Sequence, residues 1–199
     1  MNSRILAFAA ASFVASCPVF AQQSQPSPAQ PGPVSVRRND QQQRIANGVQ
    51  SGQLTAGETK NLESREAGLN REVRADRAAS GGTLTAQQQQ QIHRQQNNLS
   101  RSIYIDKHNA AQAHYGNNPV GQRRANQQNR IANGIRNGSM TAGEAARTET
   151  REQGINQRIH ADRAANGGRL TPGERQQINR QKNRASRQIY RQKHNRWRR

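Results

Sequence analysis

The heptapeptide Gly168-Arg169-Leu170-Thr171-Pro172-Gly173-Glu174 combines a signal that ends one helix with a signal that begins the next. Glycine readily adopts the positive φ angle at which many helices end. The threonine hydroxyl can accept a hydrogen bond from a free backbone N–H, and the glutamate can bond back to the threonine backbone, which makes a capping box. Proline at the first helical position loses no hydrogen bond. The stretch therefore predicts a tight turn between two helices.

Variants of this heptapeptide begin at Gly52, Gly82 and Gly138. Each has an apolar residue before its threonine, which can fold onto the core and fix the angle between the two helices. Four such signals at regular places indicate repeated helix–turn–helix structure. The residues predicted to cap the helices are Thr55, Glu58, Thr85, Gln88, Thr141, Glu144, Thr171 and Glu174.

The body of the chain contains an internal duplication. Arg-Ile-Ala-Asn-Gly at residues 44–48 recurs at 130–134, and Lys-His-Asn at 107–109 recurs at 193–195. The offset is 86 residues at both places, and also for Ala-Asp-Arg-Ala-Ala at 75–79 and 161–165, so the copies align without a gap. We call residues 37–109 copy one and residues 123–195 copy two, with 110–122 as a predicted linker and 196–199 as a basic tail.

Each copy is predicted to hold three helices, which makes the fold class all-α. In copy one they run from about Asn39 to Ser51, from Thr55 to about Ala79 and from Thr85 to about Asn109; copy two repeats them from about Ala125. Each helix has one narrow apolar stripe at helical spacing. The other faces carry Gln, Asn, Arg and Ala, which favour helix or water but not burial. We expect small helical hairpins or bundles with a small core.

The N-terminus has the pattern of a secretory signal peptide. An apolar run from Ile5 to Phe20 follows a short basic head and ends at the small residue Ala21. We expect cleavage after Ala21, export to the periplasm or the medium, and a disordered tether rich in Gln, Pro and Ser at residues 22–36. In an alternative interpretation, residues 14–17 form a lipobox and Cys17 becomes a lipidated anchor.

Cleavage after Ala21 would remove the one cysteine and all three phenylalanines. A mature chain without cysteine has no disulfide, thiolate metal site or cysteine nucleophile. With so few aromatic residues, a large buried core is not expected.

The four turns resemble the second half of an EF-hand calcium loop. In that family a 12-residue loop has Gly at the sixth position, an aliphatic residue at the eighth and a bidentate Glu at the twelfth, which match Gly168, Leu170 and Glu174. Two such turns in each copy also resemble paired EF-hands. The resemblance implies a helix–loop–helix fold and, in a functional member, a bound divalent cation. The whole repeat is also similar to uncharacterised exported bacterial proteins rich in Arg and Gln.

The ligand positions depart from the EF-hand pattern. The first, third and fifth positions of the fourth turn are Arg163, Ala165 and Gly167, and no carboxylate stands at these positions in any of the four turns. Calcium needs several oxygen ligands with negative charge. We therefore expect degenerate EF-hand-like turns without calcium, in which the glutamates serve as helix caps. No cofactor or metal ligand set is predicted.

No catalytic motif is present, and we expect that the protein is not an enzyme. The five histidines do not pair at one-turn spacing with a second histidine or with a carboxylate that recurs between copies. We interpret them as surface residues. No small-molecule substrate is predicted.

Positive charge is the strongest functional signal in the sequence. The formal net charge is +19, and residues 113–199 contribute +14 of it against +4 for residues 37–112. From Arg175 to the end there is no acidic residue, and the charge is expected on all of the last helix outside its Ile178–Ile189 stripe. The predicted polyanion-binding residues are Arg175, Arg180, Lys182, Arg184, Arg187, Arg191, Lys193, Arg196, Arg198 and Arg199.

Three functional hypotheses follow. The first is an exported, non-enzymatic helical repeat protein that binds an anionic surface or polymer (anionic lipid, lipopolysaccharide or non-specific nucleic acid) through copy two. The second is a degenerate EF-hand-like module for a divalent cation. The third is an envelope scaffold that self-associates through its apolar stripes. A basic face can also serve solubility alone.

Overall fold

The computed structural model describes residues 32–195, which form six α-helices and no strand. The prediction of an all-α fold is confirmed. The helices are α1 (Pro33–Ser51), α2 (Ala56–Ala79), α3 (Ala86–His108), α4 (Pro119–Arg136), α5 (Ala142–Ala165) and α6 (Pro172–Lys193). The predicted signal peptide, Cys17, residues 22–31 of the predicted tether and the tail 196–199 lie outside the described residues.

Each of the four turns has a glycine in the left-handed region followed by a capping box. The glycine φ angles are 76° at Gly52, 99° at Gly82, 71° at Gly138 and 86° at Gly168. In every box the threonine side chain accepts a hydrogen bond from the N–H three residues on, and the Glu or Gln there bonds back to the threonine N–H. These local contacts fix where α2, α3, α5 and α6 begin.

Two predicted boundaries are wrong. The helix α1 begins at Pro33, inside the segment predicted as tether, and α4 begins at Pro119, inside the predicted linker. Both prolines occupy the first turn, where the ring fits helical φ and its missing N–H is not needed. At α4 the Asn118 side chain also accepts a hydrogen bond from the Gly121 N–H at 3.0 Å.

Two glycines make room for the buried apolar residues of the turns. Leu54 and Met140, which precede the capping threonines of α2 and α5, are fully buried. A Cβ atom added to Gly48 would lie 2.7 Å from the Leu54 side chain, and one added to Gly134 would lie 2.7 Å from the Met140 side chain. The missing side chains therefore let each turn fold back onto the preceding helix.

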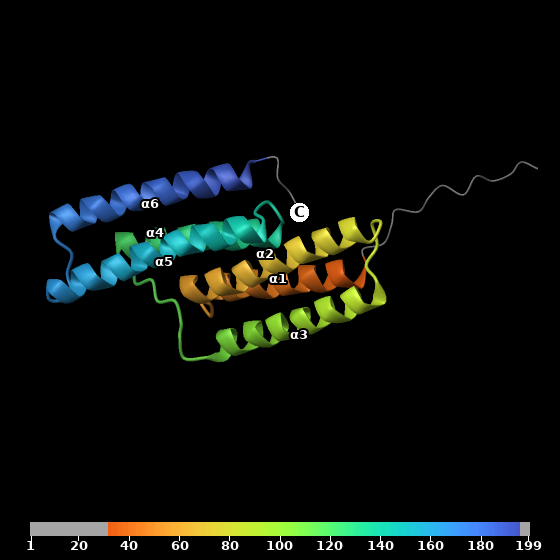
Figure 1. Cartoon of the computed structure of the whole chain (residues 1–199). Helices are drawn as coiled ribbons and strands as arrows, with labels where there is room; N and C mark the ends of the chain where they lie inside the picture. The colour runs from red at the N-terminus through yellow and green to blue at the C-terminus, as the bar shows by residue number, and fades with distance from the viewer. Residues whose placement is uncertain (1–31, 196–199) are drawn as a thin grey trace, which may run out of the picture. The chain divides into compact units, whose positions relative to one another are not determined.

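The two copies pack against each other. The most extensive contacts between helices are those of α2 with α5 and of α1 with α4, while α3 and α6 lie on opposite outer sides (Figure 1). The largest apolar cluster contains residues of both copies, among them Ile45 and Leu62 from copy one and Ile131 and Met140 from copy two. The narrow stripes of the two copies therefore make one shared core.

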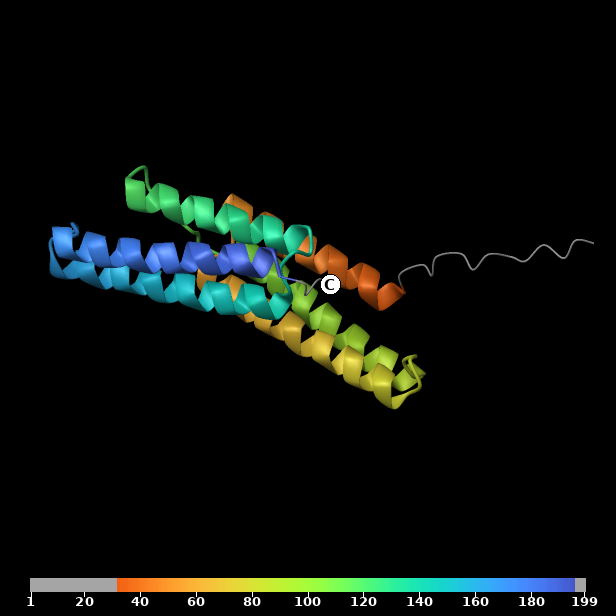
Figure 2. The same ribbon diagram turned by 90° about the horizontal axis from the view of Figure 1, so that it is seen from above.

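Smaller apolar clusters lie within each copy, on either side of the shared core. One contains Leu69, Val73 and Ile92, and the other contains Ile155, Ile159 and Ile178. The α2–α3 turn and the α5–α6 turn lie at opposite ends of the bundle (Figure 2). Each copy thus has an end where only its own helices pack.

Glutamine is part of the interior, contrary to the expectation from the sequence. Gln42 and Gln128 are buried, and their Nε2 atoms donate to the buried carboxylates of Glu63 and Glu149 at 3.1 Å and 3.0 Å. Gln127 donates to the Lys182 carbonyl at 2.9 Å. A buried polar side chain is tolerated when it is hydrogen-bonded, and these amides meet partners on neighbouring helices.

Candidate anion-binding groove

A basic groove of about 610 Å³ lies between α5 and α6. Every charged residue that lines it is an arginine: Arg151 and Arg158 from α5, and Arg184, Arg187 and Arg191 from α6. All five side chains are exposed to solvent. Arginine presents a planar fork of donors that matches carboxylate, phosphate and sulfate groups.

The buried stripes of α5 and α6 determine where these arginines point. On α6, residues 184, 187 and 191 follow one another at helical spacing beside the buried residues Ala185 and Ile189. On α5, residues 151 and 158 are two turns apart, and Ile155 lies between them as part of the groove lining. Side chains three, four and seven residues apart share a helix face. Core packing therefore turns the two arginine rows toward each other.

One groove arginine already has a carboxylate partner. Arg158 Nε lies 3.4 Å from Asp162 Oδ1, one turn further along α5, and its Nη2 donates to Gln177 Oε1 at 3.1 Å. An exposed pair of this kind contributes little to stability, because water and salt screen it. It holds the guanidinium in place without cancelling the charge of the other four arginines.

The equivalent groove in copy one is lined differently. It lies between α2 and α3, has a volume of about 360 Å³ and is lined by Arg65, Glu72 and Asn98, among others. At the offset of 86 residues, Glu72 replaces Arg158 and Asn98 replaces Arg184. Glu72 also accepts hydrogen bonds from Gln91 and Gln95, each at 2.8 Å. The same place in the fold is thus nearly neutral in copy one and strongly basic in copy two.

Three of the predicted polyanion-binding residues line the groove: Arg184, Arg187 and Arg191. Arg175 and Arg180 are exposed on α6 outside the groove lining, and Lys193 is half-buried at the end of that helix. Arg196, Arg198 and Arg199 lie outside the described residues.

Lys182 is wrongly predicted as a surface residue. Its side chain is 1% exposed, and Nζ donates to Glu152 Oε2 at 2.7 Å. Burial lowers the pKa of Lys182, and the Glu152 carboxylate opposes that shift. Residue 182 lies within the apolar stripe, one turn after Ile178. Its charge therefore pairs with Glu152 inside the bundle and does not face solvent.

The sequence interpretation missed Arg151 and Arg158, because it considered only the run of basic residues after Glu174. It also missed Arg130 of α4, which lines an adjoining pocket of about 390 Å³ with Arg187, Tyr190 and Arg191. Helical spacing places Arg151 and Arg158 on one face of α5. Their position opposite α6, however, depends on how the two helices pack.

Two exposed tyrosines and the EF-hand-like turn of Glu58 have partners within the structure. Tyr104 stacks on His108 at 4.2 Å between ring centroids, and Tyr190 stacks on His194 at 4.1 Å; both tyrosines are exposed. Within residues 32–195 no three His, Cys, Asp or Glu side chains are placed to hold a metal ion. The Glu58 carboxylate, at the twelfth position of an EF-hand-like turn, accepts from the Thr55 N–H and from Asn109 Nδ2, at 2.8 Å and 2.7 Å.

No protein-family model, curated protein or solved structure matches this chain. Within the described part of the chain, none of the helices has the length and apolar character needed to span a membrane.

Proposed function

We propose that this chain is an exported, non-enzymatic helical protein that binds an anionic surface or polymer through the groove between α5 and α6. The observation that carries the proposal is the contrast between the two equivalent grooves, one lined by five arginines and the other by one arginine and one glutamate. A charge needed only for solubility would not have to gather in one groove, since dispersed charge serves solubility as well.

The architecture behind this proposal is a tandem repeat of a three-helix unit, preceded by a disordered tether. Support comes from the helix bounds, since α2 and α5 begin and end 86 residues apart. Equivalent hydrogen bonds also recur: Gln41 donates to Ser100 Oγ at 2.8 Å, and Gln127 donates to Ser186 Oγ at 3.0 Å. One scaffold thus presents the same groove twice, and copy two carries the binding charge.

Point substitutions test the groove better than truncation. Removing α6 would also remove Ile178, Ile189 and Lys182, which are buried in the structure. The double variant Arg158→Glu/Arg184→Asn instead gives copy two the copy-one residues at these two positions and lowers the net charge by three. Its matched control, Arg94→Glu/Arg101→Asn on the exposed surface of α3, lowers the net charge equally.

The measurement is retention on immobilised heparin, a sulfated polyanion, as a function of salt. Logarithmic affinity for a polyanion falls linearly with logarithmic salt, with a slope of about −0.7 to −0.9 per neutralised charge on nucleic acids. We expect the groove variant to elute at clearly lower salt and with a shallower slope than the control. Equal elution of the two variants would mean that net charge alone governs binding.

We also propose that the chain is exported after cleavage at Ala21, with Cys17 lipidation as the alternative. The basic head, apolar run and small residue before Gln22 support cleavage. We expect the intact mass of the exported protein to match a chain beginning at Gln22. A mass that includes Cys17 with acyl chains would establish the lipoprotein, and a mass that retains Met1 would contradict both.

A further inference from the structure

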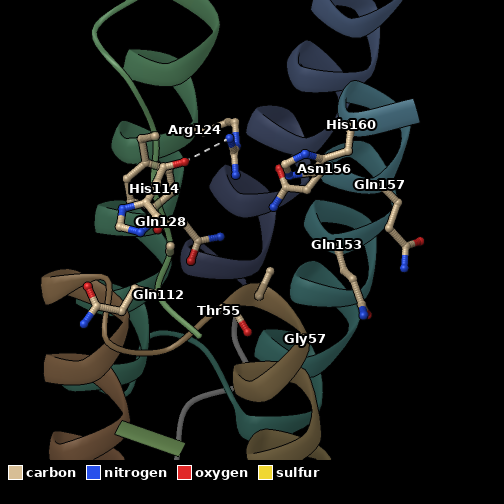
Figure 3. A pocket seen from close by; sticks show the side chains of 13 residues that line it. Thr55, Gly57, Gln112, His114, Arg124, Gln128, Gln153, Asn156, Gln157 and His160 are labelled. Atoms are coloured by element: carbon tan, nitrogen blue, oxygen red, sulfur yellow. Dashed lines mark hydrogen bonds between the residues drawn. The ribbon is translucent and has the colours of Figure 1, made fainter. Parts of the chain in front are cut away.

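A second pocket, of about 320 Å³, lies away from the basic groove. Its walls are the first turn of α2, helices α4 and α5, and the segment between α3 and α4 (Figure 3). In Figure 3 the side chains of Arg124, Gln128 and Asn156 converge on this space. None of these residues belongs to the groove proposed above, so the pocket calls for a separate explanation.

Arg124 brings a buried positive charge to the pocket. Its side chain is 8% exposed, its Nη1 makes a long hydrogen bond of 3.4 Å to the His114 carbonyl, and its Nε has no hydrogen-bond partner. The guanidinium carbon lies 5.3 Å from the centre of the Tyr115 ring. The nearby Glu152 carboxylate bonds to Lys182 through Oε2. A buried cation is costly unless it is paired. The Glu152 carboxylate only partly offsets this cost, since burial still lowers the pKa of Arg124, so an anion in the pocket would stabilise the guanidinium further.

The first turn of α2 adds backbone donors. Ala56 and Gly57, which line the pocket, are the first two residues of that helix, and their N–H groups precede the helix's own hydrogen bonds. Such N–H groups and the helix dipole favour an anion. Gly57 also leaves room, because a Cβ atom there would lie 3.0 Å from Gln153 Nε2 on the facing wall.

Gln128 brings a hydrogen-bond acceptor. It is 4% exposed, and its Nε2 donates to Glu149 Oε2 at 3.0 Å, which sets the orientation of the amide. Its Oε1 is then left without a partner. Burial raises the pKa of Tyr115 to about 12, so the phenol beside Arg124 stays neutral and does not repel an anion. The pocket therefore offers donors to an anion and one buried acceptor to a proton donor.

We propose that this pocket binds a small oxyanion that also carries a hydroxyl group, such as hydrogen phosphate or a hydroxycarboxylate. The Arg124 guanidinium and the N–H groups of Ala56 and Gly57 hold the charged oxygens. Gln128 Oε1 accepts a hydrogen bond from the hydroxyl group. The ligand thereby satisfies both the buried cation and the buried acceptor, which a simple anion cannot do.

Phosphate and sulfate distinguish this site from general attraction to a basic protein. The two ions are similar in size, but at neutral pH only phosphate has a proton to donate. We expect calorimetry of the full chain, at about 150 mM salt to screen surface charge, to show phosphate binding about tenfold or more tighter than sulfate. That ratio corresponds to about 1.4 kcal/mol, the scale of one hydrogen bond. Lactate against propionate repeats the comparison for a carboxylate.

Two glycine variants locate the site. Gly57→Ala should weaken phosphate binding about tenfold or more, because the added methyl group crowds Gln153. Gly143→Ala is the matched control at the equivalent position of α5, where the nearest side-chain atom would be 3.7 Å away. Arg124→Gln should abolish phosphate binding at the site, and circular dichroism checks that it folds. If Arg124→Gln does not fold, the comparison of the two glycine variants and the affinity ratios of the two ion pairs still test the proposal.

Several outcomes would overturn the proposal. These are no heat with phosphate or lactate, equal affinity for both members of each ion pair, or equal binding by the Gly57→Ala and Gly143→Ala variants. The anions would then bind only adventitiously to the arginine-rich surface. A preference seen only with lactate, or only with phosphate, would support the site and identify which oxyanion fits it.

Discussion

At the residue scale, the interior of this protein contains a carboxyl group, that of Glu149, which resists ionisation. Glu149 is buried between the two copies, and burial raises its pKa well above the usual value, with the nearby carboxylates of Glu152 and Glu63 adding to the shift. The Gln128 amide partly opposes it. In the unfolded chain the same carboxyl ionises near its ordinary pKa of about 4.3. Above that pH, ionisation of this carboxyl lowers the free energy of the unfolded state, while the folded state still holds the proton.

Replacing this carboxyl should therefore stabilise the fold at neutral pH. Because the pKa of Glu149 is raised in the folded state, wild-type stability falls as pH rises from about 4.3 through the folded pKa. We expect Glu149→Gln to unfold at higher urea concentration than wild type at neutral pH, with the difference vanishing at low pH.

The control is Glu174→Gln, where the sign reverses. The Thr171 backbone N–H, bonded to the Glu174 carboxylate, lowers its pKa, so the ionised form favours folding and that contribution is lost as pH falls. Glu174→Gln should thus be the less stable protein at neutral pH. If Glu149→Gln lowered stability at neutral pH, the carboxyl would be ionised and productively paired in the fold.

Residues with local partners could be predicted from the sequence, and residues with distant partners could not. Thr171 and Glu174 lie three positions apart and bond to each other, so their pattern alone predicts the cap. Lys182 bonds to Glu152, which lies 30 positions earlier on another helix. Its spacing from Ile178 placed it on the buried stripe, but its charge led to the opposite interpretation. Only the packed structure shows that the lysine and its carboxylate are buried together.

At the scale of the element, the starts of α1 and α4 were predicted wrongly because their prolines were interpreted as parts of linkers. The prolines at 33 and 119 follow Gly and Asn, and both lie in stretches rich in residues typical of linkers. An Asn before a Pro is also an N-cap followed by a first helical residue, which is the role that Asn118 and Pro119 have in α4. Composition favoured the linker, while the local pair already contained the helix signal.

Helical periodicity predicted the buried stripes of α2, α3, α5 and α6 well, because each apolar residue repeats at three- and four-residue spacing. It could not predict which helices these stripes face. Ile131 of α4 and Ile45 of α1, for example, belong to one cluster although they come from different copies. The basic groove was missed in part for the same reason, since its two rows of arginine come from two helices.

At the scale of the whole molecule, packing of residues 37–109 against residues 123–195 supplies the core. Each copy alone has narrow stripes and few aromatic residues, which indicated a small and marginal bundle. Packing α1 on α4 and α2 on α5 joins these stripes into one cluster that includes Leu62, Met140 and Ile189. Each copy thus buries its stripes against the other copy of the same chain.

The same duplication provides an internal reference for function. The two grooves occupy equivalent places, but the residues that differ between them concentrate positive charge in copy two. A binding site that depends on this groove should follow its arginines when they are moved, even if the total charge of the protein stays the same.

The most direct test is therefore a transplant at constant net charge. The quadruple variant Glu72→Arg/Asn98→Arg/Arg158→Glu/Arg184→Asn exchanges residues 158 and 184 of copy two with the equivalent residues of copy one. We predict that it elutes from heparin at higher salt than a control of equal net charge, in which Arg158→Glu/Arg184→Asn is combined with Asn39→Arg, Gln87→Arg and Gln90→Arg at exposed positions outside both grooves. The reason is that the copy-one groove of the quadruple variant holds three arginines, two new ones and Arg65. Elution of the quadruple variant no later than this control of equal net charge, with helix content intact, would contradict binding through the groove.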